Sequence, residues 1–449
     1  MKEAAFEIRK EYECGVLVVG GGVAGIAAAV CAARGGADVL LCESGGFLGG
    51  TATKGLVGPF MTCYDAKGEK QIIRGFFSEL VGRMTAAGGA VSPADCPGGD
   101  SRSGYREKGH IGVTPFDAEC LKSTAEQMCR EASVRLRYHA MLIGCECDGA
   151  RVKTAYFAGV EGVFAVSAKV FIDATGNASL AHFSGAETFR GDETGFVQTA
   201  SLFFRITGVD KEMLDLYMAE HTEMRSRYYM DEIEAARLRG EFPCGTRKLR
   251  IFEGPGDIWT VNMAQEDEPV NDLDGDCTTE AEIRQRAQIP QLIAFMRKTI
   301  PALRNIRLLD SASDIGIRET RRMVGRTLFT GEDIAACRHF DDQIAVCANS
   351  VDIHRPDKVS YSPYQNEGSY TIPLSCLISR DRVNLMAAGK CLSADAAAHA
   401  AVRVMPPCMA MGEAVGITAA LAVRLGSTPQ EVSVSQVQRL IRENGGYLE

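Results

Sequence analysis

The stretch GVLVVGGGVAGIAAAVCAAR, residues 15–34, holds a short apolar run, three consecutive glycines and an alanine-rich run, in that order. Residues 15–19 are apolar and mostly β-branched, which is typical of a strand buried on both faces of a parallel sheet. Residues 24–34 have a helical composition, and a second apolar run at 38–43 ends in Glu43. This order predicts a strand, a tight turn, a helix and a second strand, which together make one βαβ unit.

The turn of this unit fits the pattern GxGxxG through Gly20, Gly22 and Gly25. In such a turn the first glycine permits the bend, the second lets the backbone approach a pyrophosphate, and the third lets helix and strand pack closely. The helix that begins there offers free N–H groups and the positive end of its dipole to phosphates. Glu43 ends the next strand, where a carboxylate accepts hydrogen bonds from a ribose. The sequence therefore predicts a dinucleotide site.

A second glycine-rich stretch, SGGFLGGT at residues 44–51, follows Glu43 directly. Bare backbone of this kind lets a large flat cofactor lie against the chain. The turn DATG at 173–176 follows another expected strand, 169–173, and brings a strand end back toward the phosphates. No second GxGxxG in a strand–helix context occurs in the 449 residues. We therefore predict FAD rather than NAD as the cofactor, and no dedicated NAD(P)H domain.

These three features together resemble the two-dinucleotide-binding-domain flavoproteins, whose FAD fold is like that of glutathione reductase and fumarate reductase. Three later strings are similar to those of the large bacterial group called FAD-dependent oxidoreductases: GIRETRRMVG at 316–325, VDIH at 351–354 and RVMPPCMAMG at 403–412. The resemblance spans nearly the whole chain. It implies an α/β, Rossmann-like FAD-binding domain with an inserted α+β cap domain, and an oxidoreductase of unspecified substrate.

A helix is expected from Pro406 to Leu425, because proline suits the first position of a helix. In the resembling fold this N-terminus points at the N1/O2 edge of the flavin, where negative charge appears on reduction and a helix dipole stabilises it. The residues predicted to bind FAD are Gly20, Gly22, Val23, Ala24, Gly25, Glu43, Ser44, Gly49, Gly50, Thr51, Ala140, Ala174, Thr175, Gly176, Gly389, Met405 and Pro406.

The sequence departs from the family pattern near the expected flavin ring. Lys390 stands where Ala-Gly-Arg would place an arginine, and Pro407 stands where a threonine is usual. Ala396 occupies the position of a frequent histidine, with His399 three residues later. The resemblance therefore bears more firmly on the fold than on the chemistry.

Three residues are the catalytic candidates: His354, Arg403 and Arg318. A histidine with an ordinary pKa of about 6.5 suits a general base, although His354 could equally be structural. Arg403 is either an electrostatic partner of flavin or substrate, or a surface cation. The three arginines at 318, 321 and 322 are too close in sequence all to face inward, so one is expected to contact an anionic group. Lesser candidates are His399 and the thiols of Cys63 and Cys408.

Four segments are expected. The FAD-binding domain spans 12–185 and returns at 336–425, the cap domain lies between them at 186–335, and a C-terminal helix lies within 426–449. Expected helices at 116–130, 213–238 and 279–298 accompany strands at 134–144, 151–158, 162–166, 199–207 and 383–388. Residues 89–109, rich in Gly, Ser and Pro, are expected to form a surface loop.

Composition narrows the function classes. The net charge of −9 offers no basic field for nucleic acid or anionic lipid. Residues 14–33 lack charged side chains over the length of a membrane span, but the glycine triplet favours strand, turn and helix instead. Sixteen cysteines without a CxxC pair indicate scattered thiols in a reducing cytoplasm and no metal site. We expect a bacterial, cytoplasmic protein without nucleic-acid or membrane partners.

The leading hypothesis is a redox enzyme that acts on a small organic molecule by hydride transfer to or from flavin N5. One alternative is a tRNA-modifying flavoprotein of the same superfamily, which would need a basic RNA-binding face that the net charge of −9 disfavours. A second alternative is a protein that uses FAD structurally or for non-redox chemistry. Substrate, electron acceptor, direction of reaction and oligomeric state stay open.

Overall fold

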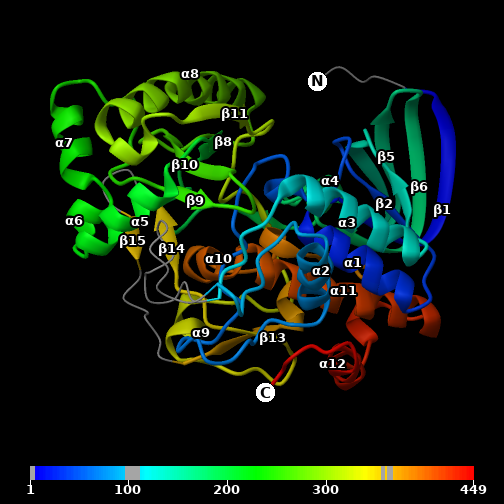
Figure 1. The fold of residues 1–449 in the computed structure, drawn as a ribbon. Coiled ribbons are helices and arrows are strands. Elements are labelled where there is room, and N and C mark those ends of the chain that lie inside the picture. Colours follow the sequence, from blue (N-terminus) through cyan, green and yellow to red (C-terminus); the bar gives the residue numbers. More distant parts are fainter. Residues whose placement is uncertain (1–5, 97–111, 355–358, 362–367) are drawn as a thin grey trace.

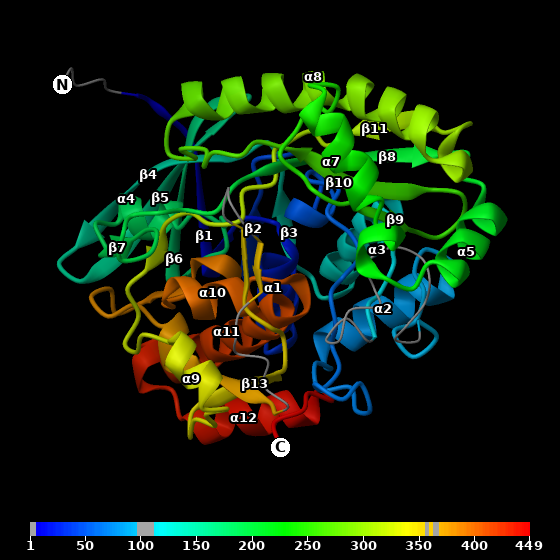
Figure 2. The same cartoon turned by 90° about the vertical axis from the view of Figure 1, so that its left-hand side faces the viewer.

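A computed structural model describes residues 6–96, 112–354, 359–361 and 368–449, without the side chains of 359–361. Two β-sheets lie apart in the molecule, and helices of both ends of the chain pack between and below them (Figures 1 and 2). The expected loop at 89–109 falls largely outside the described residues. The fold class is α/β with a Rossmann-like unit, as the sequence predicts.

The larger sheet has seven strands in the order β3-β2-β1-β6-β5-β4, and β17 pairs with β6. Its parallel strands are β1 (Ile8–Val19), β2 (Val39–Cys42), β3 (Arg135–Arg137), β6 (Gly162–Asp173) and β17 (Leu385–Ala387). The strands β5 (Arg151–Gly159) and β4 (Met141–Asp148) add an antiparallel edge. The carboxyl ends of β1, β2 and β6 meet at one edge, which is where ligands bind in sheets of this kind.

Some strand predictions are wrong in their limits. The two strands expected at 162–166 and 169–173 form the single strand β6. One edge of β6 pairs with β1, and on the other edge its first half pairs with β5 and its end pairs with β17. Conversely, the single strand expected at 134–144 is split into β3 and β4. His139 lies between them with a φ of 52°, a left-handed conformation that no strand continues through.

The helices α1 (Val23–Arg34) and α11 (Met405–Leu425) pack on each other although they lie far apart in sequence. Glycines on α11 permit this approach: a Cβ on Gly412 would lie 2.2 Å from the carbonyl oxygen of Ala24, and one on Gly416 would lie 2.4 Å from that of Ala28. In the described part of the chain α11 is long and apolar enough to cross a membrane, but it is mostly buried and serves as a core helix.

The smaller sheet has the order β11-β8-β10-β9 and is entirely antiparallel. Its strands are β8 (Ser201–Thr207), β9 (Ile251–Glu253), β10 (Trp259–Gln265) and β11 (Arg307–Ser311), and α8 (Gly275–Thr299) covers one face (Figure 2). It has its own apolar core, which includes Phe204, Trp259 and Met296. This unit lies within the expected cap, whose exact limits of 186–335 stay a prediction.

The helical stretch expected at 213–238 is interrupted twice. It forms α5 (Lys211–Glu220), α6 (Met224–Arg227) and α7 (Met230–Leu238). The φ of 52° at Tyr229 ends one helix before the next begins.

The remaining elements complete both parts. They are η1 (Gly50–Ala52), α2 (Phe76–Ala86), α3 (Ala118–Glu131), α4 (Ser179–Phe183), β7 (Thr188–Phe189), η2 (Pro301–Leu303), β12 (Arg322–Met323), α9 (Gly331–Ala335), β13 (Gln343–Cys347), β14 (Asp352–His354), β15 (Val359–Tyr361), β16 (Tyr370–Pro373), η3 (Leu374–Leu377), η4 (Gly389–Cys391), α10 (Ala396–Val402), η5 (Pro429–Glu431) and α12 (Val434–Glu443).

Candidate functional site

The three glycines of the first turn have different physical reasons for lacking a side chain. Gly20 has a φ of 101°, and a Cβ there would lie 2.4 Å from the carbonyl oxygen of Ala174. A Cβ on Gly25 would lie 1.9 Å from the carbonyl oxygen of Gly20. At Gly22, by contrast, φ is an ordinary −67° and the nearest atom to a Cβ is the Cα of Gly50 at 4.0 Å. The fold therefore requires Gly20 and Gly25, whereas the space at Gly22 is left open for a ligand.

The second glycine stretch lies directly against the first. The N–H of Gly49 donates to the carbonyl oxygen of Gly21 at 2.8 Å, and Gly49 and Gly50 have φ values of 109° and 53°. A Cβ on Gly50 would lie 2.8 Å from the Cα of Gly22. The helix α1 begins at this place, and its N-cap residue, Gly22, has no side chain that could cap it. Bare backbone and uncapped N–H groups fit a pyrophosphate.

Glu43 is buried at the end of β2 and organises the backbone around it. Its Oε2 accepts the N–H of Gly21 at 2.7 Å, and its Oε1 accepts the N–H of Gly45 at 2.7 Å. The Nζ of Lys54 lies 2.7 Å from the same Oε1, and the hydroxyl of Ser44 donates to it at 3.1 Å. Burial raises the pKa of Glu43, but the Lys54 ammonium and these N–H groups outweigh it and hold the pKa below its usual value. The carboxylate is therefore ionised at neutral pH.

The end of β6 comes back beside the first turn, as the DATG string predicts. The N–H of Ala174 donates to the carbonyl oxygen of Val19 at 2.8 Å. Asp173 turns inward and accepts the N–H and hydroxyl of Thr175, at 3.0 and 2.7 Å. The structure also brings Ala140 to this edge, since its N–H donates to the carbonyl oxygen of Glu43 at 2.9 Å.

The C-terminal part supplies the opposite wall. Gly389, with a φ of 72°, lies close enough to α1 that a Cβ there would be 3.1 Å from the Cβ of Ala24. Met405 begins α11 and Pro406 follows within the first turn, while Val404 precedes the helix without a side-chain cap. Lys390 is half-buried, with its Nζ donating to the carbonyl oxygen of Ile317 at 2.7 Å. The chain thus places residues from both of its ends around one cradle.

The structure gathers the three catalytic candidates around one further residue, Asp352. The Nε2 of His354 lies 3.0 Å from the Oδ2 of Asp352. An Nη2 group of Arg403 donates to the backbone oxygen of Asp352 at 3.1 Å and lies 3.5 Å from Oδ2. Arg318 is fixed by its Nη1 and Nη2 groups, which donate to the carbonyl oxygen of Thr199 at 2.6 Å and to the hydroxyl of Ser201 at 2.7 Å.

Burial and charge define the protonation states of this cluster. Burial raises the pKa of Asp352, but His354, Arg403 and Arg318 outweigh it and hold the carboxyl ionised. Burial lowers the pKa of His354 to about 4, so the ring is neutral at pH 7. Burial, and then the charge of Arg403, lowers the pKa of Arg318 to about 9, which leaves it charged. Because ionised Asp352 can only accept, Nε2 of His354 carries the hydrogen and Nδ1 carries the lone pair.

Sequence reasoning missed Asp352 although it quoted the string that holds it. Asp352 and His354 are two residues apart on β14, so their side chains leave the strand on the same side. That spacing could have found the pair. Lys54 and its contact with Glu43 carry no comparable local signal.

The lesser candidates have other surroundings. Arg321 donates to the carbonyl oxygen of Asn177 at 3.2 Å, and Arg322 is fully buried with its Nη2 3.3 Å from the Oε1 of Glu319. His399 is completely buried, and burial and the cations around it hold its pKa well below the usual value. Burial raises the pKa of the thiols of Cys63 and Cys408 to about 12 each. Neither sulfur is therefore a thiolate at neutral pH.

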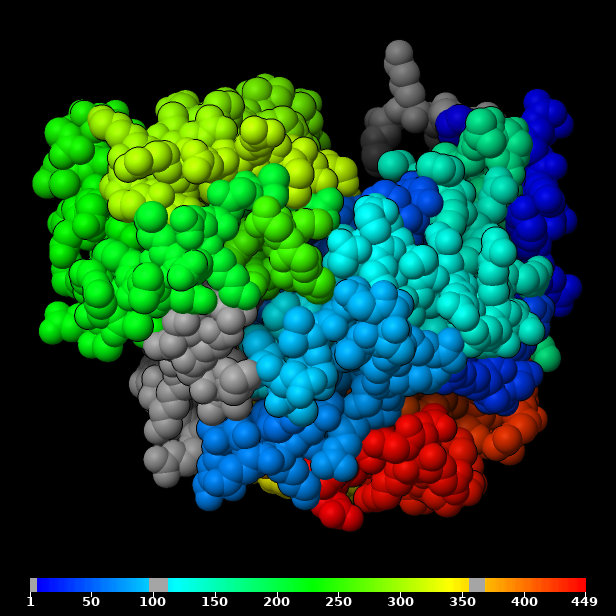
Figure 3. Space-filling view, viewed as in Figure 1, coloured from blue at the N-terminus to red at the C-terminus, as the bar shows by residue number. Residues whose placement is uncertain are grey.

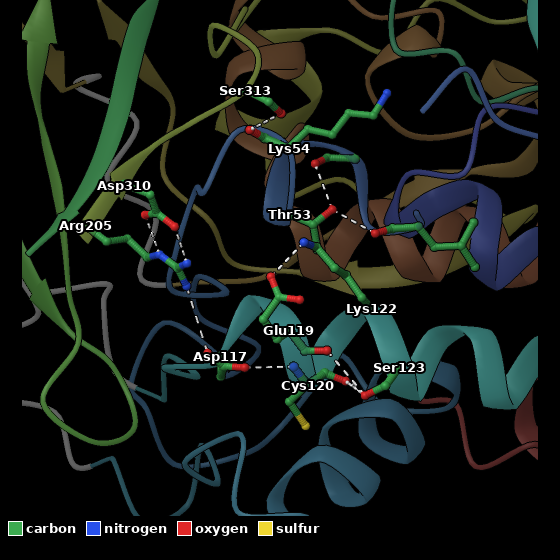
Figure 4. A network of polar contacts seen from close by, with 12 residues as sticks. Thr53, Lys54, Asp117, Glu119, Cys120, Lys122, Ser123, Arg205, Asp310 and Ser313 are labelled. Atoms are coloured by element: carbon green, nitrogen blue, oxygen red, sulfur yellow. Dashed lines mark hydrogen bonds and ion pairs between the residues drawn. The ribbon is translucent and has the colours of Figure 1, made fainter. Parts of the chain in front are cut away.

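The smaller sheet contacts the FAD cradle through polar links that Figure 4 shows. Arg205 on β8 pairs with Asp310, Nη2 to Oδ2 at 2.5 Å, and its Nη1 lies 4.0 Å from the Oδ2 of Asp117. The hydroxyl of Ser313 donates to the backbone oxygen of Lys54 at 3.2 Å. A narrow cleft runs beside these links and is lined by Ala52, Leu56, Phe116, Arg205 and Ile258, among others.

In Figure 3 the lobe of the smaller sheet, in green, stands apart from the larger sheet at the top of the molecule.

Within the described residues no group of His, Cys, Asp or Glu side chains is arranged to hold a metal ion. All sixteen cysteines lie in the described part, and no two of them form a disulfide.

Comparison with known proteins identifies the family. Residues 15–441 match the family described as FAD dependent oxidoreductase. No match to a curated protein was found. Among solved structures, a geranylgeranyl bacteriochlorophyll reductase-like protein of Thermoplasma acidophilum aligns with a TM-score of 0.47 and 13% identity over 96% of this chain and 84% of that one. The p-nitrophenol 4-monooxygenase PnpA of Pseudomonas putida aligns with a TM-score of 0.48, 13% identity and the same coverages of 96% and 84%.

The anhydrotetracycline hydroxylase OxyS of Streptomyces rimosus aligns with a TM-score of 0.47 and 11% identity over 95% of this chain and 65% of that one. Likenesses this distant say nothing of the substrate or the reaction. The family match covers nearly the whole chain, and the open space at Gly22, the uncapped N-terminus of α1 and the ionised Glu43 fit its cofactor. The chain therefore belongs to the FAD-dependent oxidoreductase family and is an enzyme whose cofactor is FAD.

Proposed function

We propose that this flavoenzyme oxidises or reduces a small organic molecule by hydride transfer to or from flavin N5, at the junction of the larger and smaller sheets. The observation that carries the proposal is the cluster of His354, Asp352, Arg403 and Arg318. It joins β14 and the end of α10 through the contact of Arg403 with Asp352, and it joins the segments flanking the smaller sheet through the contacts of Arg318 with Thr199 and Ser201. Neutral histidine, ionised aspartate and charged arginines are groups suited to moving a proton and holding a polar substrate.

The residues that would hold FAD fall into two groups. The turn at Gly20–Gly25 and the stretch at Gly49–Thr51 would hold the pyrophosphate, and Glu43 would accept hydrogen bonds from the ribose. The start of α11 at Met405 and Pro406, with Gly389, would lie along the flavin. FAD when bound supplies an acceptor or donor of a hydride at N5.

The protein groups supply the proton transfer and the orientation. His354 would take a proton on Nδ1 during substrate oxidation, and return it in the reverse direction. Asp352 holds the Nε2–H, which fixes the ring and stabilises the charged imidazolium that forms. Arg403 and the dipole at the N-terminus of α11 would favour negative charge nearby. Arg318 contributes charge from a position fixed by the backbone.

The alternatives have less support. A tRNA-modifying flavoprotein would need a basic face, and the net charge of −9 disfavours one. Structural use of FAD would give no reason to gather two partly buried arginines around a histidine–aspartate pair. We propose a cytoplasmic location, because sixteen cysteines without a disulfide suit a reducing compartment.

To test whether the protein uses its flavin for redox chemistry, the flavin of the purified protein is reduced by light and then reoxidised with candidate acceptors. A substrate library is then screened for bleaching or recovery of the flavin absorbance. Rapid turnover with one substrate class, lost in His354→Gln with FAD still bound, is the expected result. A flavin that cannot be reduced, or whose reduced form reacts with no member of the library, would sink the redox proposal.

A further inference from the structure

The Asp352 cluster carries more positive than negative charge. Arg403, Arg318 and Arg250 lie close enough for their charges to act on it: burial, then Arg403 and Arg250, lowers the pKa of Arg318. Asp352 is the ionised carboxylate that opposes them, and His354 is neutral. Glu319, the other carboxylate beside Arg403, pairs with a fourth arginine, Arg322. Among the described residues, three guanidinium groups therefore share one carboxylate.

Buried charge without a counter-charge is costly, and proteins rarely keep it unless a ligand supplies the opposite sign. The side chain of Arg403 is only 14% exposed, and its Nε–H is buried with no acceptor among the described residues. Its Nη2 group already serves Asp352 and Gln198. The Nε–H of Arg403 therefore has no acceptor among the described residues, and a bound ligand could supply one.

Arg318 differs from Arg403 in how its donors are used. Both of its Nη groups are committed, to the carbonyl oxygen of Thr199 and the hydroxyl of Ser201. These bonds come from the segment that enters β8, so the smaller sheet fixes the place of this charge. Arg318 attracts an anion through space, while Arg403 has the free N–H to contact it.

We infer that the substrate carries a carboxylate, which Arg403 contacts through Nε–H and which the charges of Arg318 and Arg250 attract. This deepens the proposed function and rests on it. A carboxylate fits better than a neutral group, because a neutral ligand would leave the three partly buried guanidinium groups with one carboxylate between them. Its place beside His354 would hold a neighbouring carbon near the base, so that binding and proton transfer share one site.

The test uses the FAD-loaded protein in its oxidised state, in which the flavin ring is neutral. The wild type is titrated with malonate and with succinate. Calorimetry and the difference spectrum of the flavin report binding of each ligand. Succinamide is the matched neutral ligand, and inorganic phosphate is the competing oxyanion. We expect saturable binding of a dicarboxylate, no binding of succinamide, and affinity about ten- to a hundredfold lower in Arg403→Gln.

Two controls separate binding from folding. Arg439→Gln removes an exposed arginine that pairs with Glu443 on α12, and should leave carboxylate binding unchanged. FAD content and melting temperature of Arg403→Gln should match the wild type. If that variant does not fold, the comparison of succinate with succinamide on the wild type still shows whether binding requires a carboxylate.

Three results overturn the inference: no carboxylate binds, succinamide binds as well as succinate, or phosphate binds more tightly than every carboxylate. Equal affinity in folded Arg403→Gln also overturns it. Failure here is distinct from failure of the redox proposal, because photoreduction of the same sample reports on the flavin alone. A flavin that can be reduced in a protein that binds no carboxylate would be consistent with the proposed redox function and would exclude a carboxylate substrate.

Discussion

The Nζ atom of Lys54 lies 2.7 Å from the Oε1 atom of Glu43, while the backbone oxygen of Lys54 accepts the N–H of Ser313 at 2.9 Å. One residue therefore connects the carboxylate expected to bind the ribose with the chain that leaves β11. Asp314 adds to this, with its Oδ2 3.9 Å from the same Nζ. Lys54 therefore links the nucleotide end of the site to the chain beyond β11, and Figure 4 shows its backbone oxygen beside Ser313.

Lys54→Met should make FAD binding more sensitive to acid. Burial raises the pKa of Glu43 and Lys54 lowers it, so removing the ammonium leaves burial to dominate. The ionised carboxylate binds ribose, and its contribution is lost as the pH falls through its folded pKa. The wild type should therefore keep FAD to a lower pH than the variant. Released FAD is followed by fluorescence during acid titration, with Lys153→Met as the control, since Lys153 is exposed and pairs with exposed Asp148. Superimposable release curves would refute this.

Glu43→Ala should weaken FAD binding about ten- to a hundredfold, because it removes a charge-assisted hydrogen bond of about 1.5–3 kcal/mol. It also leaves the N–H groups of Gly21 and Gly45 without their acceptor, so some loss of stability is expected. Equilibrium dialysis measures the affinity, and Glu146→Ala on the exposed face of β4 is the control. A protein that binds FMN as well as FAD would contradict the role of the ribose.

Gly22→Ala should separate ligand binding from folding. Its Cβ would have no neighbour closer than 4.0 Å in the protein, so the free energy of unfolding of the FAD-free protein should change by no more than about 1 kcal/mol. The methyl group would fill the space left for the pyrophosphate, and FAD affinity should fall at least about tenfold.

Gly25→Ala is the counterpart, because its Cβ would lie 1.9 Å from the carbonyl oxygen of Gly20 and the variant should not fold. Urea denaturation and FAD titration measure the two effects. Normal FAD affinity in Gly22→Ala would show that the pyrophosphate does not bind at this turn.

Arg403→Ala should lower the reduction potential of the flavin while the Gly20–Gly25 turn still binds FAD. A charge effect of about 1–2 kcal/mol corresponds to a two-electron potential more negative by roughly 20–45 mV. Spectroelectrochemical titration measures this against Arg439→Ala. An unchanged potential would exclude the role of Arg403 at the flavin edge, even if substrate binding collapsed.

Glu413 should make the protein less stable as the pH rises. It is buried on α11, where its Oε2 accepts the N–H of Phe76 at 3.1 Å, and burial raises its pKa from 4.5 to about 7. The folded state therefore binds more protons than the unfolded state between these values, and the free energy of unfolding falls as the pH rises through that window.

Glu413→Gln keeps an acceptor for Phe76 and has no charge to bury. It should be more stable than the wild type above pH 7, by on the order of 3 kcal/mol, and match it near pH 4. Urea unfolding at several pH values measures the difference, with Glu443→Gln as the exposed control. A constant difference across the pH range would show that Glu413 does not titrate.

The part of the site that sequence reasoning could predict is local in sequence. Gly20, Gly22, Gly25 and Glu43 belong to one βαβ unit, whose turn chemistry is readable from neighbouring residues, and the structure shows that unit. The helix α2 was missed although the signal was present, since its buried residues recur with helical spacing: Phe76, Phe77, Leu80, Val81 and Met84.

The Asp352 cluster could not be predicted in the same way. Arg318, Asp352 and Arg403 come from three separate segments, and the packing of β14 against α10, which ends at Arg403, brings Arg403 to Asp352. The limits of β6 were misjudged for a related reason. In the sequence the polar Ser167 divides two apolar runs, but its hydroxyl lies 3.1 Å from that of Thr154 on the neighbouring strand, so β6 continues through it.

The contact of α1 with α11 has a consequence for synthesis on the ribosome. The phosphate turn is made among the first residues, yet the side of α1 that packs against α11 has no cover until residues 405–425 have been translated. The nascent chain should therefore retain FAD only late in translation, after α11 has left the exit tunnel. Until then, α1 presents an alanine-rich surface that chaperones of the nascent chain can bind.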